Sequence, residues 1–330
     1  MPDAIELANV TKTFGAQTAV DDLSLRVPAG SVYGFIGPNG SGKTTTLRMI
    51  TRILLPDRGT VRVLGEDHHG PANDRVAYLP EERGLYKQMR VRELLRFYAR
   101  LKSYTPAPAE IDHWLERMQL AEHGNKKIEQ LSKGMSQKVQ FIATVISKPE
   151  LVLLDEPFSG LDPINATVLR EMVLDLKKQG TTIIFSTHDM SIAEKMCDFI
   201  FMIFRGKKVL DGTLDSIQRD YGSDTIRVEF LETSSSSIPD AGSEVLRRAG
   251  SNPNDAPISQ VATPLLNGRL TDLPGVLNVT DFGKYQELRV EKDCDSQRLL
   301  ATLMQRGPVS HFEIAHPTLQ DIFVRVAGGS

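Results

Sequence analysis

The chain has 330 residues, of which 40% are hydrophobic and 25% are charged, and its formal net charge at pH 7 is −3. This length is sufficient for a large core and two domains, and the slightly acidic balance gives no indication of nucleic acid as a partner. The two cysteines, Cys197 and Cys294, lie far apart and have no metal-ligand spacing. This argues against a structural disulfide or a zinc site and is consistent with a reducing cytoplasm.

Hydrophobic residues occur in short runs along the whole chain. The first residues lack the basic start and apolar core of a secretory signal peptide. Among the longest apolar runs is 199–204, which has the length of a strand, and no window approaches the roughly eighteen residues of a membrane-spanning helix. We therefore expect no transmembrane segment in this chain, so any role at a membrane would require a partner protein.

The first two thirds of the chain alternate between strand and helix patterns, which is typical of an α/β domain with a parallel sheet. Strands are predicted at 5–10, 20–27, 31–36, 60–64, 75–79, 151–154 and 181–186. Helices are predicted from residue 45, within 91–120 with a break at 105–108, and at 136–147 and 163–178. The run at 151–154 is continuously apolar, as expected for a parallel strand that is covered on both faces.

The composition changes after residue 221, and we place the boundary between two domains there, at 1–220 and 221–330. Residues 232–256 are rich in Ser, Gly, Pro, Asn and Asp, which predicts a flexible surface insertion. Strands are predicted at 225–230, 276–280, 286–290 and 309–314, and helices at 295–306 and after Pro317. This order is compatible with a small α+β domain resembling the ferredoxin-like split βαβ arrangement.

Residues 37–44 read Gly-Pro-Asn-Gly-Ser-Gly-Lys-Thr and fit the phosphate-binding pattern G-x-x-x-x-G-K-[ST] between a predicted strand and a predicted helix. Glycines allow consecutive backbone N–H groups to surround an anion, and the helix adds its N-terminal donors. We expect Lys43 to contact the β- and γ-phosphates of a nucleotide and Thr44 to ligate Mg²⁺. The expected phosphate-binding residues are Gly37, Pro38, Asn39, Gly40, Ser41, Gly42, Lys43, Thr44 and Thr45. A chance glycine-rich turn is the disfavoured alternative.

Two carboxylates, Asp155 and Glu156, follow the apolar run at 151–154. Asp155 would bind Mg²⁺ through water close to Thr44, and Glu156 would polarise an attacking water. A solvated strand end is the common alternative for an isolated Asp-Glu pair, but the residues at 157–162 that follow this pair weaken that alternative.

Residues 131–137 read Leu-Ser-Lys-Gly-Met-Ser-Gln, and with the preceding motifs this stretch resembles the signature of the ATP-binding cassette superfamily. Ser159 to Asp162 resemble the D-loop of that family, His188 its switch histidine and Phe14 the aromatic residue that stacks on adenine. The resemblance covers about residues 4–215. It implies a P-loop NTPase fold with a helical subdomain at about 85–145. It also implies nucleotide contacts in trans from Ser132, Lys133, Gly134 and Gln137, and catalytic roles for Lys43, Glu156, Asp162 and His188.

One position departs from the family pattern. Glu81, in Tyr-Leu-Pro-Glu-Glu-Arg-Gly at 78–84, aligns with a glutamine that reaches the metal and the attacking water. A carboxylate can ligate Mg²⁺, but it adds negative charge and cannot donate a hydrogen bond while ionised. We favour a modified metal contact at Glu81 over the alternative that its side chain points to solvent.

The resemblance implies ATP hydrolysis coupled to transmembrane transport, with Mg²⁺ as cofactor. Two copies, in a homodimer, would hold ATP between the phosphate loop of one and the signature of the other. The partner would be an integral membrane permease, which would place the chain peripherally at the cytoplasmic face of the plasma membrane. Residues 85–130 would pass the motion to that permease. Trp114 within them is expected to belong to the core of the subdomain.

The C-terminal ending at 316–324 and the stretch at 78–86 are similar to those of sodium or drug efflux ATPases, so we favour export over import. The extension after 220 could be regulatory, strengthen the dimer or be structural, and dimer support is slightly favoured.

A soluble cassette ATPase is disfavoured, because the chain has one set of motifs and no sustained heptads. A regulatory module that binds nucleotide without hydrolysing it is also disfavoured, because such a module would lack Glu156 or His188, and this chain has both. The cargo is not encoded here, because its contacts lie in the permease.

Overall fold

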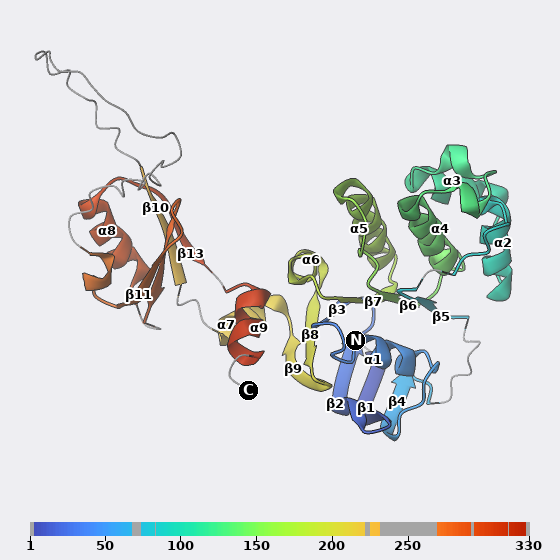
Figure 1. Cartoon of the computed structure of the whole chain (residues 1–330), viewed down its shortest axis with the longest axis horizontal. Coiled ribbons are helices and arrows are strands. Elements are labelled where there is room, and N and C mark those ends of the chain that lie inside the picture. The colour runs from blue at the N-terminus through green and yellow to red at the C-terminus, as the bar shows by residue number, and fades with distance from the viewer. Residues whose placement is uncertain are drawn as a thin grey trace, which may run out of the picture. The chain divides into compact units, whose positions relative to one another are not determined.

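The computed structural model describes residues 3–67, 74–82, 84–221, 225–231, 269–291, 294–315 and 317–327. The predicted insertion at 232–256 lies outside these residues. The chain divides into two compact units, one formed by Met1–Ile217 with Leu319–Ser330 and the other by Gln218–Thr318 (Figure 1). The first transition lies three residues before the predicted boundary. The last helix, which we had assigned to the C-terminal domain, is grouped with the first unit.

A six-stranded sheet forms the centre of the first unit, in the order β5-β6-β7-β3-β8-β9. The strands are β3 (Val32–Ile36), β5 (Val76–Leu79), β6 (Leu151–Asp155), β7 (Thr182–Thr187), β8 (Phe199–Phe204) and β9 (Lys207–Gly212). The first five strands in this order pair in parallel, and β9 pairs antiparallel with β8. All residues of β3, β6 and β7 are buried, as the continuous apolar pattern predicts for strands covered on both faces.

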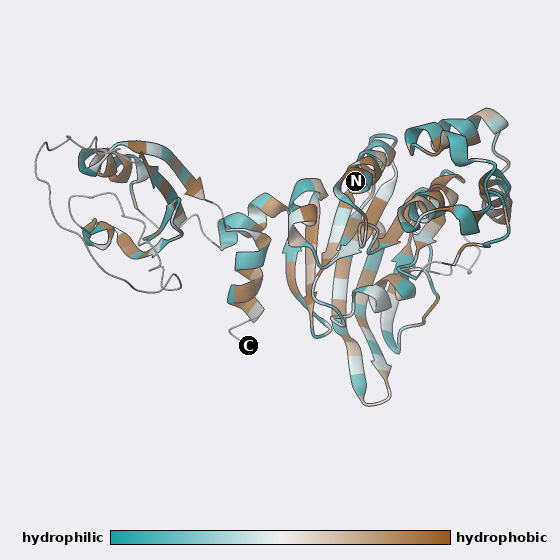
Figure 2. Ribbon diagram, turned by 45° about the horizontal axis from the view of Figure 1, so that its top comes forward, coloured by the Kyte–Doolittle hydropathy of each residue, from teal (hydrophilic) through white to brown (hydrophobic). Residues whose placement is uncertain are grey.

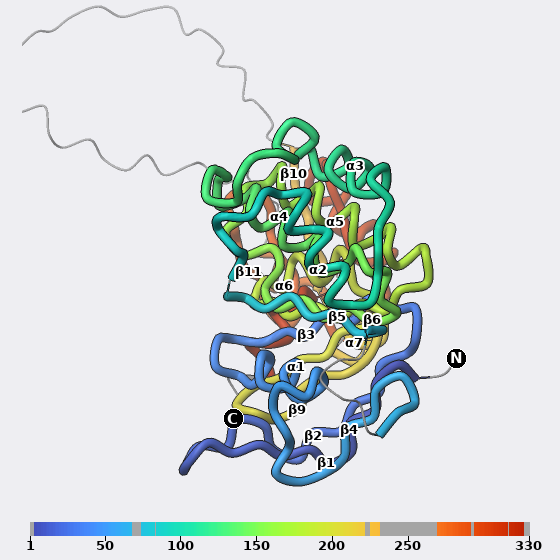
Figure 3. Tube along the Cα trace, turned by 90° about the vertical axis from the view of Figure 1, so that its right-hand side faces the viewer, coloured from blue at the N-terminus to red at the C-terminus, as the bar shows by residue number. Residues whose placement is uncertain are grey.

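A three-stranded antiparallel sheet with the order β2-β1-β4 covers one face of the central sheet. Its strands are β1 (Asp3–Phe14), β2 (Gln17–Pro28) and β4 (Arg58–Val63). Helices cover the opposite face, so the unit has three layers (Figures 1 and 3). The α-helices of this part of the chain are α1 (Lys43–Ile50), α2 (Val91–Leu101), α3 (Pro108–Arg117), α4 (Lys133–Val145), α5 (Pro163–Lys178), α6 (Met190–Met196), α7 (Leu214–Asp220) and α9 (Leu319–Ala327). Short 3-10 turns occur at Ala121–His123 and Ile128–Gln130.

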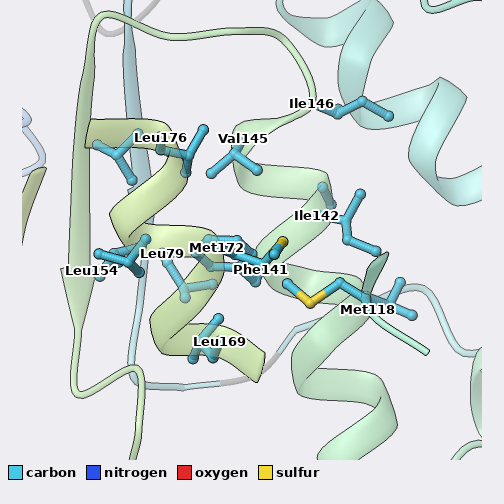
Figure 4. Close-up of a cluster of buried hydrophobic side chains, with 14 of the residues drawn as sticks. Leu79, Met118, Phe141, Ile142, Val145, Ile146, Leu154, Leu169, Met172 and Leu176 are labelled. Atoms are coloured by element: carbon cyan, nitrogen blue, oxygen red, sulfur yellow. The ribbon is translucent and has the colours of Figure 1, made fainter. Parts of the chain in front are cut away.

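The alternation of side chains along β6 produces two cores. Val152 and Leu154 join the cluster under the helices, whereas Leu151 and Leu153 join the cluster under the antiparallel sheet. Figure 4 shows Leu154 and the side chains of α4 and α5 that face it. The central sheet is therefore fixed on both faces.

Helices α2, α3 and α4 form a group at one side of the first unit (Figure 1). The predicted break between the first two is confirmed, because Pro108 is the first residue of α3. Trp114 is partly buried and packs against the helical core, as expected. In Figure 2, brown residues run along the strands of this unit, and its helices carry teal residues on their outer sides. Within the described parts of the chain, no helix has the length and apolar character needed to cross a membrane.

The second unit contains a four-stranded antiparallel sheet in the order β11-β12-β10-β13. Its elements are β10 (Thr225–Phe230), a 3-10 turn (Leu270–Asp272), β11 (Val276–Asp281), β12 (Gln286–Val290), α8 (Ser296–Arg306) and β13 (Val309–Ala315). Leu299 and Leu303 of α8 pack on Ile226 and Leu288 of the sheet. This strand order is that of the split βαβ arrangement, and the connection from β10 to β11 runs largely outside the described residues.

We expect Phe141→Ala to lower the free energy of unfolding of the first unit by about 3–5 kcal/mol, because it opens a cavity under the sheet. The Phe141 side chain is fully buried on α4. Urea unfolding can be followed by the fluorescence of Trp114, the single tryptophan, which packs against the same core. The matched control is Leu101→Ala at a position that is 62% exposed. An equal effect of both substitutions would contradict the assignment of this core.

Candidate functional site

The phosphate loop connects β3 to α1, as the motif predicts. Gly42 precedes the helix with φ 112°, and a Cβ atom there would lie 2.5 Å from the carbonyl oxygen of Ala19. Only glycine fits this conformation and this contact. Gly42 offers no side-chain acceptor to the helix, and the first turn of α1 contains no acidic residue. The N–H groups at this helix end are therefore free of competing anionic side chains, which favours a bound phosphate.

Lys43 is buried inside the loop, with 6% of its side chain exposed. Its Nζ atom donates to the carbonyl oxygens of Gly37 at 2.7 Å and Pro38 at 3.2 Å, and it lies 3.7 Å from Oε1 of Glu156. Burial lowers the pKa of Lys43, and the negative charges of Glu156 and Asp155 oppose this shift. The loop thus holds the ammonium group of Lys43, and phosphate oxygens can replace the two carbonyl oxygens as its hydrogen-bond acceptors.

The Ser41 side chain is also buried, and its Oγ atom has no hydrogen-bond partner in the described structure. A buried hydroxyl without a partner is costly. This unsatisfied group in the middle of the phosphate loop fits a ligand with acceptor oxygens.

Asp155 lies at the end of β6 and is surrounded by hydroxyl groups. Oδ1 accepts hydrogen bonds from Thr44 Oγ1 at 3.1 Å and from Ser186, and Oδ2 accepts from Tyr78 Oη at 3.3 Å. Burial raises the pKa of Tyr78 to about 12, and the charge of Asp155 adds to the shift, so this phenol remains a donor at neutral pH. The predicted proximity of Thr44 and Asp155 is confirmed.

Glu156 follows Asp155 in a left-handed backbone conformation with φ 49°. This conformation is strained for a non-glycine residue. The backbone N–H donates to Ser186 Oγ at 3.0 Å, and both carboxylate oxygens lie 3.0 Å from Nδ1 of His188. Glu156 is 8% exposed, whereas the side chain of His188 is 56% exposed. The buried carboxylate is therefore held between a lysine and a histidine.

Glu81 follows β5 and is exposed. Its negative charge is the smallest of the influences that raise the pKa of Lys43. Glu81 is thus close enough to the phosphate loop to act on its cation. Its role as a metal contact stays a prediction.

The signature segment lies at the start of α4. Ser132 caps this helix by accepting from Met135 N at 3.2 Å, and Gln137 Nε2 donates to the carbonyl oxygen of Pro157. In the D-loop, Asp162 caps α5 by accepting from Asn165 N at 2.9 Å, and this bond is the largest cause of its lowered pKa.

The signature and the D-loop lie side by side. A Cβ atom on Gly134 would be 3.4 Å from Nδ2 of Asn165, and one on Gly160 would be 3.5 Å from Nζ of Lys133. Within the described residues, no hydrogen bond or ion pair links Ser132, Lys133 or Gly134 to the phosphate loop. The role of the signature residues in binding nucleotide stays a prediction.

Phe14 ends β1 with its side chain 49% exposed, and Nζ of Lys12 lies 5.7 Å from the ring centroid. Asp57 fixes this strand end by accepting from Lys12 Nζ at 2.8 Å and from Thr13 N and Oγ1 at 2.7 Å each. These hydrogen bonds, that of Lys12 first, lower the pKa of Asp57. The exposed ring is thus presented on a fixed strand end.

Two residues of the site were not predicted as such. Ser186 joins Asp155 and Glu156, and Tyr78 completes the hydroxyl groups around Asp155. Both have polar groups within otherwise apolar strand patterns, which was the available signal. Their partners depend on the pairing of β6 with its neighbours.

The sequence matches two family models, ABC transporter over residues 20–159 and the C-terminal domain of DrrA1-3-like ATP-binding proteins over residues 254–327. It is 36% identical over 326 residues to the uncharacterized ABC transporter ATP-binding protein YhaQ of Bacillus subtilis, covering 98% of each chain. It is 35% identical over 235 residues to Nod factor export ATP-binding protein I of Paraburkholderia xenovorans, covering 69% of this chain and 77% of that protein.

A solved structure of an ATP-binding subunit of an ABC transporter superposes with a TM-score of 0.61 at 32% identity, covering 66% of this chain and 93% of that structure. This similarity confirms the expected P-loop NTPase fold. The chain therefore belongs to the ATP-binding proteins of ABC transporters, in the group with a DrrA-like C-terminal domain, and it is a transport ATPase subunit that binds and hydrolyses ATP and works with a membrane permease.

Proposed function

We propose that two copies of this chain bind MgATP head to tail and hydrolyse it with Glu156 as general base, driving export through a separate permease. The observation that carries this proposal is the buried Glu156 carboxylate between Lys43, at 3.7 Å, and His188, at 3.0 Å, beside the phosphate loop. A cation, a carboxylate and a histidine at one phosphate site are the groups needed for attack of water on a γ-phosphate.

The phosphate loop would bind the nucleotide phosphates through Lys43, the hydroxyl of Ser41 and backbone N–H groups at the start of α1. Phe14 would stack on adenine. The cost of burying Lys43 supports this assignment, because phosphate oxygens add negative charge and acceptors close to the buried ammonium group.

Mg²⁺ would be held by the Thr44 hydroxyl and, through water, by Asp155, with Glu81 as a further contact. The described residues contain no group of three or more His, Cys, Asp and Glu side chains arranged for a metal ion. This fits Mg²⁺, which usually binds one or two protein oxygens together with phosphates and waters. When bound, it would neutralise charge on the β- and γ-phosphates.

In the hydrolytic step, Glu156 would accept a proton from the attacking water. His188 would contact the same carboxylate and face the γ-phosphate from its exposed side. Ser186 would act as a positioning residue, because it bonds both the side chain of Asp155 and the backbone of Glu156.

The homodimer is supported by the separation of the two half-sites. The signature residues Ser132, Lys133, Gly134 and Gln137, with the D-loop residue Asp162, would cover the phosphate loop of the other copy. This cover would exclude water and add donors to the γ-phosphate, so that binding of ATP closes the dimer.

The permease would contact the helical group near the end of β5. Tyr86, Phe97 and Tyr98 form an aromatic cluster with ring centroids 5.4–6.4 Å apart, and Tyr86 is 56% exposed. Tyr86 follows Glu81 closely in the sequence, so a change at the nucleotide site could be transmitted to a partner at this surface. The chain would then lie at the cytoplasmic face of the plasma membrane.

Export is supported by the Nod factor export relative and by the match to the DrrA-like C-terminal domain. Sodium and drugs are candidate cargoes.

We expect Glu156→Gln to lower kcat for ATP by at least about 100-fold and to accumulate an ATP-bound dimer, because the amide cannot accept the proton. ATPase assays and light scattering with size-exclusion chromatography measure both effects. The control is Glu150→Gln, at an exposed position at the edge of β6. Hydrolysis by Glu156→Gln at the wild-type rate would refute the assignment of the base.

Lys43→Ala should weaken binding of ATP by at least about tenfold or abolish turnover, because it removes the cation of the phosphate loop. Titration with a fluorescent ATP analogue measures the affinity. Lys207→Ala, at a lysine that is 70% exposed, is the control. Wild-type affinity and turnover in Lys43→Ala would exclude this lysine from the site.

Ser186→Ala should lower kcat by about tenfold or more with little change in KM, because the N–H of Glu156 loses its acceptor and the carboxylate of Asp155 loses a donor. Steady-state ATPase kinetics separate the two parameters. Ser186→Thr retains the hydroxyl and should restore kcat. If Ser186→Thr is as impaired as Ser186→Ala, volume rather than the hydroxyl is what matters at this position.

A further inference from the structure

Helix α9 returns to the first unit after the second unit is complete. Its first backbone N–H, at Leu319, donates to Oε1 of Glu194 in α6 at 2.6 Å. Leu319 and Ile322 are fully buried, and the ring of Phe323 packs edge-on against Phe204 at 5.6 Å. The helix is thus attached to α6, which directly follows the switch histidine.

A cavity of about 590 Å³ lies between α9 and the nucleotide site. Its walls are formed by the phosphate loop, the segment from His188 into α6, and α9. The lining residues are Pro38, Asn39, His188, Asp189, Met190, Ser191, Gln320, Phe323 and Val324. Val324 is 63% exposed at its edge. The cavity therefore has apolar side chains from both α6 and α9 and is continuous with the phosphate loop.

The same chain carries an exposed apolar side chain next to its D-loop. Ile164, in the first turn of α5, is 71% exposed, the largest value among the exposed large hydrophobic side chains of the described residues. The loop before it is fixed, because Leu161 packs on the helical core and Asp162 caps α5. Ile164 is thus held in solvent on a rigid support.

We propose that Ile164 of one copy inserts into this cavity of the second copy, so that α9 is part of the ATP-dependent dimer interface. The proposal rests on the head-to-tail dimer proposed above and adds the C-terminal helix to it. Each copy has both the exposed Ile164 and this cavity, so a two-fold axis satisfies both contacts at once.

A second copy is the occupant that the observations favour over a peptide or a small molecule. The cavity includes Pro38, Asn39 and His188, which belong to the half-site that the other copy would cover. Ile164 belongs to the other half-site, because the D-loop lies beside the signature. When the signature of one copy approaches the phosphate loop of the other, the same movement brings Ile164 toward the cavity.

This arrangement gives the C-terminal extension a role in closure. The polypeptide leaves the first unit at Ile217 and re-enters it at Leu319, so the second unit is connected at both ends. Displacement of α9 would remove one wall of the cavity next to His188. Dimer formation would then depend on the attachment of α9 to α6.

Cross-linking tests the contact directly. Ile164→Cys and Val324→Cys are prepared separately, each with Glu156→Gln, and mixed with MgATP and a short bismaleimide. We expect a covalent dimer in the mixture, much less of it without ATP, and none with either variant alone. The single variants control for Cys197 and Cys294. A mixture that forms the dimer in solution without any specific cross-link would overturn the proposal.

Affinity provides the second measurement. In the Glu156→Gln chain, Val324→Asp should raise the dissociation constant of the ATP-bound dimer at least about tenfold, because it places a charge against Ile164. Its affinity for a fluorescent ATP analogue should stay within about twofold of the parent, because the phosphate loop is intact. Leu101→Asp, 62% exposed on α2, is the matched control and should leave the dimer unchanged.

The outcomes separate this proposal from the proposed function. If Glu156→Gln forms no dimer with MgATP, the head-to-tail dimer and the proposed contact both fail. If that dimer forms and Val324→Asp dimerises as tightly as the parent, the contact of α9 fails while the dimer stands.

Discussion

The parallel pairing of β6, β7 and β3 is the constraint on which the whole nucleotide site depends. The carboxyl ends of neighbouring parallel strands meet at one edge of a sheet. The phosphate loop follows β3, Asp155 ends β6 with Glu156 next to it, and His188 follows β7. Segments separated by more than a hundred residues therefore meet at this edge, where Thr44 contacts Asp155 and Lys43 contacts Glu156. The two hydrophobic cores fix this sheet from both faces, so packing below the edge sets the position of each side chain of the site.

Lys43 is the group at this edge that favours an anion. A buried ammonium group lies near two buried carboxylates, and burial lowers the pKa of Lys43 although both carboxylates act to raise it. The desolvation penalty of such a group is offset only by close charges and hydrogen bonds. Lys43 has backbone carbonyls as partners, which are weaker acceptors than phosphate oxygens. The orphaned hydroxyl of Ser41 adds a further group that a phosphate can satisfy.

Sequence reasoning identified the residues of this site that belong to contiguous motifs, because a loop or a strand end is specified locally. Glycine spacing predicts the phosphate loop, and the apolar run before Asp155 predicts a buried strand. Ser186 and Tyr78 were missed as site residues, because their roles follow from strand register, which a single sequence does not specify. The return of α9 to the first unit was also missed, because it depends on contacts between segments that lie far apart in the sequence. Its amphipathic pattern predicts a helix with one buried face, but it does not predict that this face packs on α6.

The proposed head-to-tail dimer would have a mechanical consequence. The signature and the D-loop are joined by close contact between Gly134 and Asn165 and by the packing of Leu161. The phosphate loop and α6 are joined through the pairing of β3 with β7 and the contacts of α6 with both strands. In the proposed dimer, a nucleotide bound between two copies would therefore act on two packed bodies in each copy. Because α9 is attached to the second of these bodies, its contribution to the interface would respond to the same nucleotide. Closure of the dimer and attachment of the C-terminal helix would then be coupled, so that each would favour the other.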